Sequence, residues 1–168
     1  MGAAAINDAV CRHLDAMLDS GVHLIWQTGK AYYDRCRARA GDKKHVTILP
    51  FVQDVSEAYV LADAVVCRAG ALTLAELKHF RKPALLIPSP NVADDHQRHN
   101  AESMTRLGTA LMLLESEIKD KFFVYWNRLL NARWALTRRL HALPVKNAAQ
   151  ECVDVIFELF HERPQTSA

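Results

Sequence analysis

The stretch RAGALTLAE, residues 68–76, carries residue types that could hold a phosphorylated ligand. It follows the apolar run ADAVV, and its glycine stands where a helix would begin. Gly70 allows close approach of a ligand to the backbone. The helix start behind it leaves unpaired N–H groups, those of Ala71, Leu72 and Thr73. Because these groups and the helix dipole point the same way, such a helix start favours anions.

Glu76 lies one turn further along the same predicted helix and could accept hydrogen bonds from the hydroxyl pair of a sugar. From these residues alone, a phosphate site and a structural turn with Thr73 as helix cap are about equally good interpretations. The sequence contains neither GxGxxG nor a Walker A glycine pattern. The usual dinucleotide and P-loop interpretations are therefore weak.

A second polar cluster is DDHQRHN, residues 94–100. Its histidines, His96 and His99, lack a third well-placed ligand, so a polar helix start is a better interpretation than a metal site. Gln97 and Asn100 are better suited to sugar hydroxyls, since each amide offers a donor and an acceptor. No Ser/His/Asp constellation can be assembled from spacing. We expect no metal, no cofactor and no catalytic residue in this chain.

The elements that must position these residues alternate between strand and helix up to about residue 114. Strands are expected at 22–29, 45–51, 63–67, 83–88 and 109–114. Helices are expected at 3–18, 30–41, 54–62, 71–80 and 96–108, with an N-cap at Asp54 and a terminating glycine at Gly41. The pattern predicts an α/β fold with a Rossmann-like parallel sheet and helices on both faces. The continuous apolar runs 63–67 and 84–88 are expected to be buried on both sides.

A helical segment is expected from about residue 115, within one ligand-binding domain spanning 1–162. Residues 147–162 would form its last helix, and 163–168 a flexible tail. Aromatic and arginine residues mingle between residues 122 and 140. An amphipathic helix packing on the sheet is the favoured interpretation, and a helix lying on a membrane is the alternative. Folds of this type usually open with a strand, whereas here a helix begins almost at Met1.

Composition fits an intracellular globular protein. The chain has 168 residues, half of them apolar, and a net charge of +2, which is too small to argue for nucleic acid. The cysteines match no zinc or CxxC spacing and suit reduced thiols; they are Cys11, Cys36, Cys67 and Cys152. We find no signal peptide and no apolar run of about 20 residues that could cross a bilayer.

The densest of these motifs resemble a known family. RAGALTLAE, with KPALLIPSPNVADDHQRHNAE downstream, closely resembles the donor-binding half of glycosyltransferase family 28. The stretches GAAAIN at 2–7, WQTGK at 26–30 and NAA at 147–149 also match. The resemblance implies the C-terminal half of a B-type glycosyltransferase fold. It also implies an inverting transfer of N-acetylglucosamine from UDP-GlcNAc to a lipid-linked peptidoglycan precursor, at the cytoplasmic face of the bacterial inner membrane.

The resemblance also assigns roles to individual residues. Val52 matches the position whose backbone contacts uracil, and Arg68 precedes the helix start that would face the diphosphate. Glu76 matches the acid that binds the ribose hydroxyls. The resemblance also implies that three residues lie around the sugar. Gln97 and Asn100 come from the second polar cluster, and Asn7 lies near the start of the chain.

The family's N-terminal domain, which holds the lipid acceptor, is absent from this sequence, as are the first strand and its phosphate-binding turn. We therefore expect a truncated or split enzyme that is inactive alone and marginally stable. The alternatives are a non-catalytic donor-binding subunit that associates with an acceptor-domain chain, a UDP-sugar transferase with another acceptor such as diacylglycerol, and a gene remnant that binds nothing.

Overall fold

The computed structural model of the chain describes residues 3–90, 95–144, 153 and 157. Its strands are β1 (Leu24–Gln27), β2 (Val46–Leu49), β3 (Val65–Cys67), β4 (Ala84–Leu86) and β5 (Ala110–Met112). Its α-helices are α1 (Ala4–Asp19), α2 (Tyr33–Ala40), α3 (Val55–Leu61), α4 (Ala71–His79), α5 (His96–Arg106) and α6 (Ile118–Ala142). Short 3-10 turns, η1 (Lys30–Tyr32) and η3 (Glu115–Glu117), precede α2 and α6. The predicted α/β fold with parallel strands is confirmed.

Two predictions fall mainly outside the described residues. The helix expected at 147–162 is described only at Val153 and Phe157, both in helical conformation. The matching NAA motif at 147–149 and the tail expected at 163–168 are not among the described residues.

The strands form two parallel sheets rather than one. β1 pairs with β2, and β3, β4 and β5 pair in that order. Within the described residues, β1 and β3 each have a strand neighbour on one side only. The prediction of burial on both sides is correct for β4, which is fully buried, and wrong for β3, which is only partly buried. A strand with one neighbour lacks the cover that a second neighbour supplies.

Local signals explain where helices begin and end. The Asp54 carboxylate accepts hydrogen bonds from the N–H groups of Ser56 at 2.9 Å and Glu57 at 3.2 Å, which caps α3 as predicted. Gly41 follows α2 with φ 56°, and its N–H donates to the carbonyl of Arg37 at 2.9 Å. Glycine is suited to this left-handed position just past a helix end.

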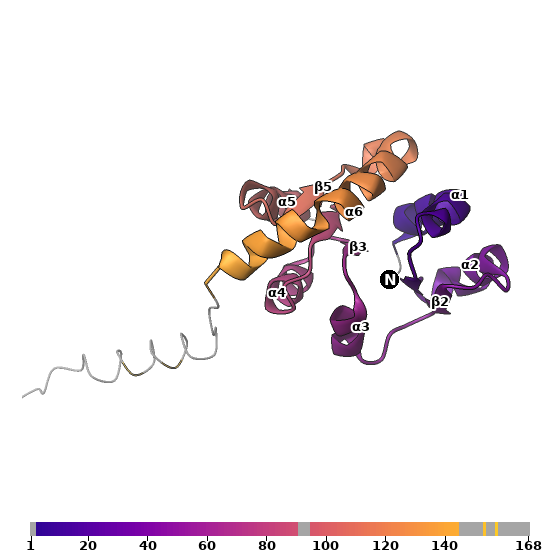
Figure 1. Ribbon diagram of the computed structural model, residues 1–168, viewed down its shortest axis with the longest axis horizontal. Helices are drawn as coiled ribbons and strands as arrows, with labels where there is room; N and C mark the ends of the chain where they lie inside the picture. The colour runs from indigo at the N-terminus through magenta and orange to yellow at the C-terminus, as the bar shows by residue number, and fades with distance from the viewer. Residues whose placement is uncertain (1–2, 91–94, 145–152, 154–156, 158–168) are drawn as a thin grey trace, which may run out of the picture.

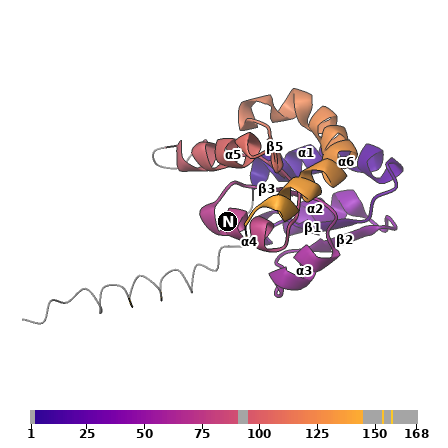
Figure 2. The same cartoon turned by 60° about the vertical axis from the view of Figure 1, so that its left-hand side comes forward.

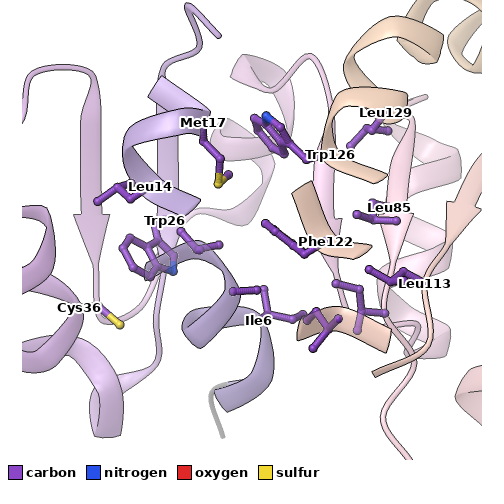
Figure 3. Close-up of a cluster of buried hydrophobic side chains, with 14 of the residues drawn as sticks. Ile6, Leu14, Met17, Trp26, Cys36, Leu85, Leu113, Phe122, Trp126 and Leu129 are labelled. Atoms are coloured by element: carbon purple, nitrogen blue, oxygen red, sulfur yellow. The ribbon is translucent and has the colours of Figure 1, made fainter. Parts of the chain in front are cut away.

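Helix α6 joins the two sheets. It begins beside α1 and runs toward the side of α4 and α5 (Figure 1). Its buried side chains belong to one face, as the amphipathic prediction required: Ile118, Phe122, Trp126, Leu129, Leu136 and Leu140. Figure 3 shows Phe122 between Ile6 of α1 on one side and Leu85 of β4 and Leu113, the residue after β5, on the other. Among the described residues, no helix is long and apolar enough to cross a membrane.

Candidate functional site

The site predicted from the sequence lies at the edge of the sheets where the strands end. The strands are parallel, so the loops after β2, β3, β4 and β5 leave from their carboxyl ends, which is where ligands of open α/β sheets bind. A cleft of about 710 Å³ opens there after β4 and β5. Residues of the two loops and of the α5 start line it, namely Pro88, Ser89, Pro90, Asp95, Arg98, Leu114, Glu115 and Ser116.

The start of α4 offers unpaired backbone donors. Gly70 is its N-cap residue, and the first backbone hydrogen bond runs from the Leu74 N–H to the Gly70 carbonyl at 3.0 Å. In the described part of the chain no side chain caps this helix. Three N–H groups therefore remain to meet a ligand, those of Ala71, Leu72 and Thr73. The alternative of Thr73 as helix cap is wrong, because Thr73 lies inside the first turn.

The fold itself does not require a glycine at position 70. Its φ of −68° and ψ of 149° are extended backbone that any residue adopts. A Cβ placed there would approach no described atom closer than 3.8 Å, the Oγ1 of Thr73. The space beside Gly70 is therefore open, as close approach of a ligand to the backbone would require.

Glu76 is held in place by α3. The Tyr59 hydroxyl donates to Oε2 of Glu76 at 3.0 Å, and the Tyr59 ring stacks on Phe80 with ring centroids 5.2 Å apart. Burial, with Cys67 and Glu76 nearby, raises the pKa of Tyr59 above its ordinary range. The hydroxyl therefore stays protonated and continues to donate. In the described part of the chain Tyr59 is the hydrogen-bond donor to this carboxylate, so Oε1 remains to accept from a ligand.

Arg68 closes the space between the loops rather than pointing to the α4 start. Its Nη1 donates to the carbonyl oxygens of Ile87 at 3.1 Å and Pro88 at 3.2 Å, and its Nη2 pairs with the Glu115 carboxylate. The three contacts tie the loops after β3, β4 and β5 together. Through Pro88 and Glu115, Arg68 also borders the cleft, although none of the predicted binding residues lines it.

Gln97 and Asn100 lie on α5 and hold two of these loops. The Asn100 Nδ2 donates to the carbonyl of Ala69 at 3.0 Å, directly before Gly70. The Ser89 N–H donates to Oε1 of Gln97 at 2.9 Å. Each amide thus uses one of its two polar atoms on the backbone, and no hydrogen bond of the other is seen among the described residues. The structure brings both residues to the same side as the α4 start.

The structure places two predicted residues at the ends of the strands of the β1–β2 sheet. The Val52 N–H donates to the side chain of Gln27 at 2.9 Å. Asn7 is buried, and its amide donates to the Thr28 carbonyl at 2.8 Å and accepts from the Trp26 indole at 3.0 Å. Asn7 thus fastens α1 to the end of β1. Sequence reasoning missed this role.

Metal ligation was the weaker interpretation of the second polar cluster. The described residues contain no group of three His, Cys, Asp or Glu side chains placed to hold an ion. His99 Nδ1 instead lies 3.8 Å from the Glu102 carboxylate, one turn along the same helix. Asp94 is outside the described residues.

Comparison with known proteins identifies the relatives of this chain. The profile of the glycosyltransferase family 28 C-terminal domain matches residues 1–151. A Flavobacterium psychrophilum protein, the UDP-N-acetylglucosamine–N-acetylmuramyl-(pentapeptide) pyrophosphoryl-undecaprenol N-acetylglucosamine transferase, is 36% identical over 162 residues, which cover 95% of this chain and 44% of that protein. The protein of the same name from Chlorobaculum tepidum is 46% identical over 120 residues, covering 71% of this chain and 33% of that protein.

Among solved structures, the crystal structure of Acinetobacter baumannii MurG superposes with a TM-score of 0.75 at 29% identity. The match covers 94% of this chain and 47% of that one. The chain therefore spans less than half the length of the relatives it matches.

Proposed function

The chain belongs to glycosyltransferase family 28 through that family's C-terminal domain, and from this premise we propose that it binds the sugar donor UDP-N-acetylglucosamine. One observation carries the proposal: an open glycine corner leads into unpaired helix N–H groups, with a held carboxylate one turn further on. The diphosphate would lie against the N–H groups of Ala71, Leu72 and Thr73, and the ribose hydroxyls would donate to Glu76.

The chemistry that follows is inverting transfer. An acceptor hydroxyl attacks the anomeric carbon of the sugar and gives its proton to a base on the acceptor-binding unit. The bond between that carbon and the β-phosphate oxygen breaks, and UDP leaves. Negative charge grows on the β-phosphate as that bond breaks. The start of α4 would stabilise this charge with fixed N–H donors and the positive end of its dipole, which need no reorganisation during the reaction.

The acceptor side completes the proposal. The relatives named above act on an undecaprenol-linked muramyl pentapeptide, and the match covers 44% of the first of them. We propose the same class of lipid-linked acceptor, bound by a second unit that these residues do not supply. The isolated chain should therefore bind donor without turning it over. Turnover should appear when an acceptor-binding unit of the family is added, whether on a separate chain or in a fusion.

Replacing Gly70 by alanine should separate donor binding from folding. The added Cβ meets no described atom within 3.8 Å, and the loss of the N-cap glycine is offset by reduced freedom of the unfolded chain. We expect the free energy of unfolding to change by less than about 1 kcal/mol. Affinity for UDP should fall about tenfold, since a methyl group would displace the diphosphate from the N–H groups.

Isothermal titration of UDP, UDP-GlcNAc and UDP-glucose into both proteins measures this. A folded wild-type chain that binds none of the three would contradict donor binding. UDP-glucose binding as tightly as UDP-GlcNAc would instead favour a transferase of another sugar.

A further inference from the structure

Helix α6 has a second face that the described residues leave uncovered. Opposite its buried stripe lie exposed residues at helical spacing, namely Lys121, Val124, Arg128, Asn131, Trp134 and Arg138. Two of them are apolar and strongly exposed, Val124 at 58% and Trp134 at 69%. We call these six residues the outer face of α6. Figure 2 shows the helix along the outside of the molecule, in front of the strands.

The charge of this segment is of one sign. From Lys121 to Ala142 the sequence contains no Asp or Glu, while the outer face carries Lys121, Arg128 and Arg138. Arg81 and Lys82, before β4, extend the positive surface; with Arg133 and Trp134 they border a small pocket of about 140 Å³. The acids nearby are Asp63 in that pocket and, at the start of α6, Asp120 and Glu117, the second of which pairs with Lys121. A net charge of +2 for the whole chain conceals this local excess.

The aromatic rings of the segment lie beside its cations. The Arg128 guanidinium lies 4.8 Å from the Tyr125 ring centroid, and that of Arg133 lies 5.3 Å from the Trp134 ring centroid. An indole exposed between arginines on a helix of 25 residues, about 37 Å long, suits the boundary between lipid headgroups and acyl chains. There the ring enters the apolar layer while the arginines remain at the phosphates.

We propose that the outer face of α6 docks on the surface of an anionic lipid bilayer. Val124 and Trp134 enter the headgroup region, and Arg128 and Arg138 bind lipid phosphates. The helix begins two residues after Ser116, which lines the cleft at the carboxyl ends of the strands. A bilayer along α6 would therefore leave that cleft beside the membrane, where a lipid-linked substrate could reach it. The docking surface itself is independent of donor binding.

Tryptophan emission reports on this face selectively. Trp26 and Trp126 are buried, at 5% and 7% exposure, while Trp134 is exposed at 69%. Vesicles of equal parts phosphatidylglycerol and phosphatidylcholine should shift the emission to the blue, and brominated lipid should quench it. Phosphatidylcholine vesicles alone should do neither. The shift should vanish in Trp134→Phe, while co-sedimentation with the anionic vesicles is largely retained.

Charge variants test the same surface by co-sedimentation. Each removed arginine should weaken binding to the anionic vesicles about fivefold, so Arg128→Gln with Arg138→Gln should weaken it about 25-fold. The matched control removes the same charge from exposed positions elsewhere, Arg37→Gln with Lys44→Gln, and should change binding by less than about twofold. UDP affinity should be unchanged in both pairs.

Three results would overturn the proposal. The first is Trp134 emission that anionic vesicles do not change, and the second is an equal loss of vesicle binding in the control pair. The third is a shift of Trp134 emission with duplex DNA but not with vesicles, which would assign the outer face of α6 to nucleic acid.

Discussion

Replacing Phe122 by alanine is expected to lower the free energy of unfolding by about 3–5 kcal/mol. The ring is fully buried and lies between α1 and the three-stranded sheet, so its loss leaves a cavity where α6 joins the two sheets (Figure 3). Its neighbours cannot easily close that cavity, because they belong to separate elements held apart by their own contacts. Urea denaturation followed by circular dichroism measures the change.

The matched control for this variant is Phe51→Ala. Phe51 has the same side chain but is 60% exposed, so its truncation should cost less than about 1 kcal/mol. Equal losses for the two variants would contradict the central role of Phe122 in joining the sheets.

Replacing Glu76 by alanine is expected to weaken UDP binding about 30- to 150-fold. Hydrogen bonds from the ribose hydroxyls to a charged carboxylate contribute about 2–3 kcal/mol to the binding free energy. The half-buried position of Glu76 on α4 keeps stability nearly unaffected beyond the loss of the bond from Tyr59. Calorimetric titration of UDP measures the change, with thermal unfolding as the check on folding.

Two further variants test whether the loss of UDP binding comes from the Glu76 carboxylate itself. Tyr59→Phe should weaken UDP binding roughly two- to tenfold, because the carboxylate loses the donor that orients it. Glu57→Ala removes an exposed acid at the start of α3 and should leave affinity unchanged. If UDP binds Glu76→Ala as tightly as the wild type, the ribose role is wrong.

Much of the fold could be predicted because local signals and hydrophobic patterns agree. Each strand and helix from α1 to α6 was expected within a few residues of its place. Asp54 caps the start of α3 and Gly41 follows the end of α2, as their residue types favour. The α4 corner could be found because a glycine before an apolar helix is a short-range pattern. Donor binding at that corner is still a prediction.

What the sequence could not provide are contacts between distant residues. From the sequence, the amides of Gln97 and Asn100 are equally suited to bind sugar hydroxyls. Only the structure shows that each also forms a hydrogen bond to a loop backbone. Cys11 and Cys36 are 25 positions apart, yet α1 and α2 bring their sulfurs to 3.8 Å. The exposed Trp134 was likewise hidden, because an amphipathic pattern does not show how far a neighbouring element covers a helix.

The division of the strands into two sheets also determines which contacts break first when the molecule partly unfolds. Among the described residues no backbone hydrogen bond joins β1 to β3, so the sheets can separate by breaking side-chain contacts, chiefly those of α1 and α6 and of Val66 in β3. Such a partial opening leaves each ladder intact, whereas exposing the amides of β4 requires its paired neighbours to part. Deuterium uptake should therefore begin along the strand edges that have no neighbour, those of β1 and β3 among them, and reach β4 last.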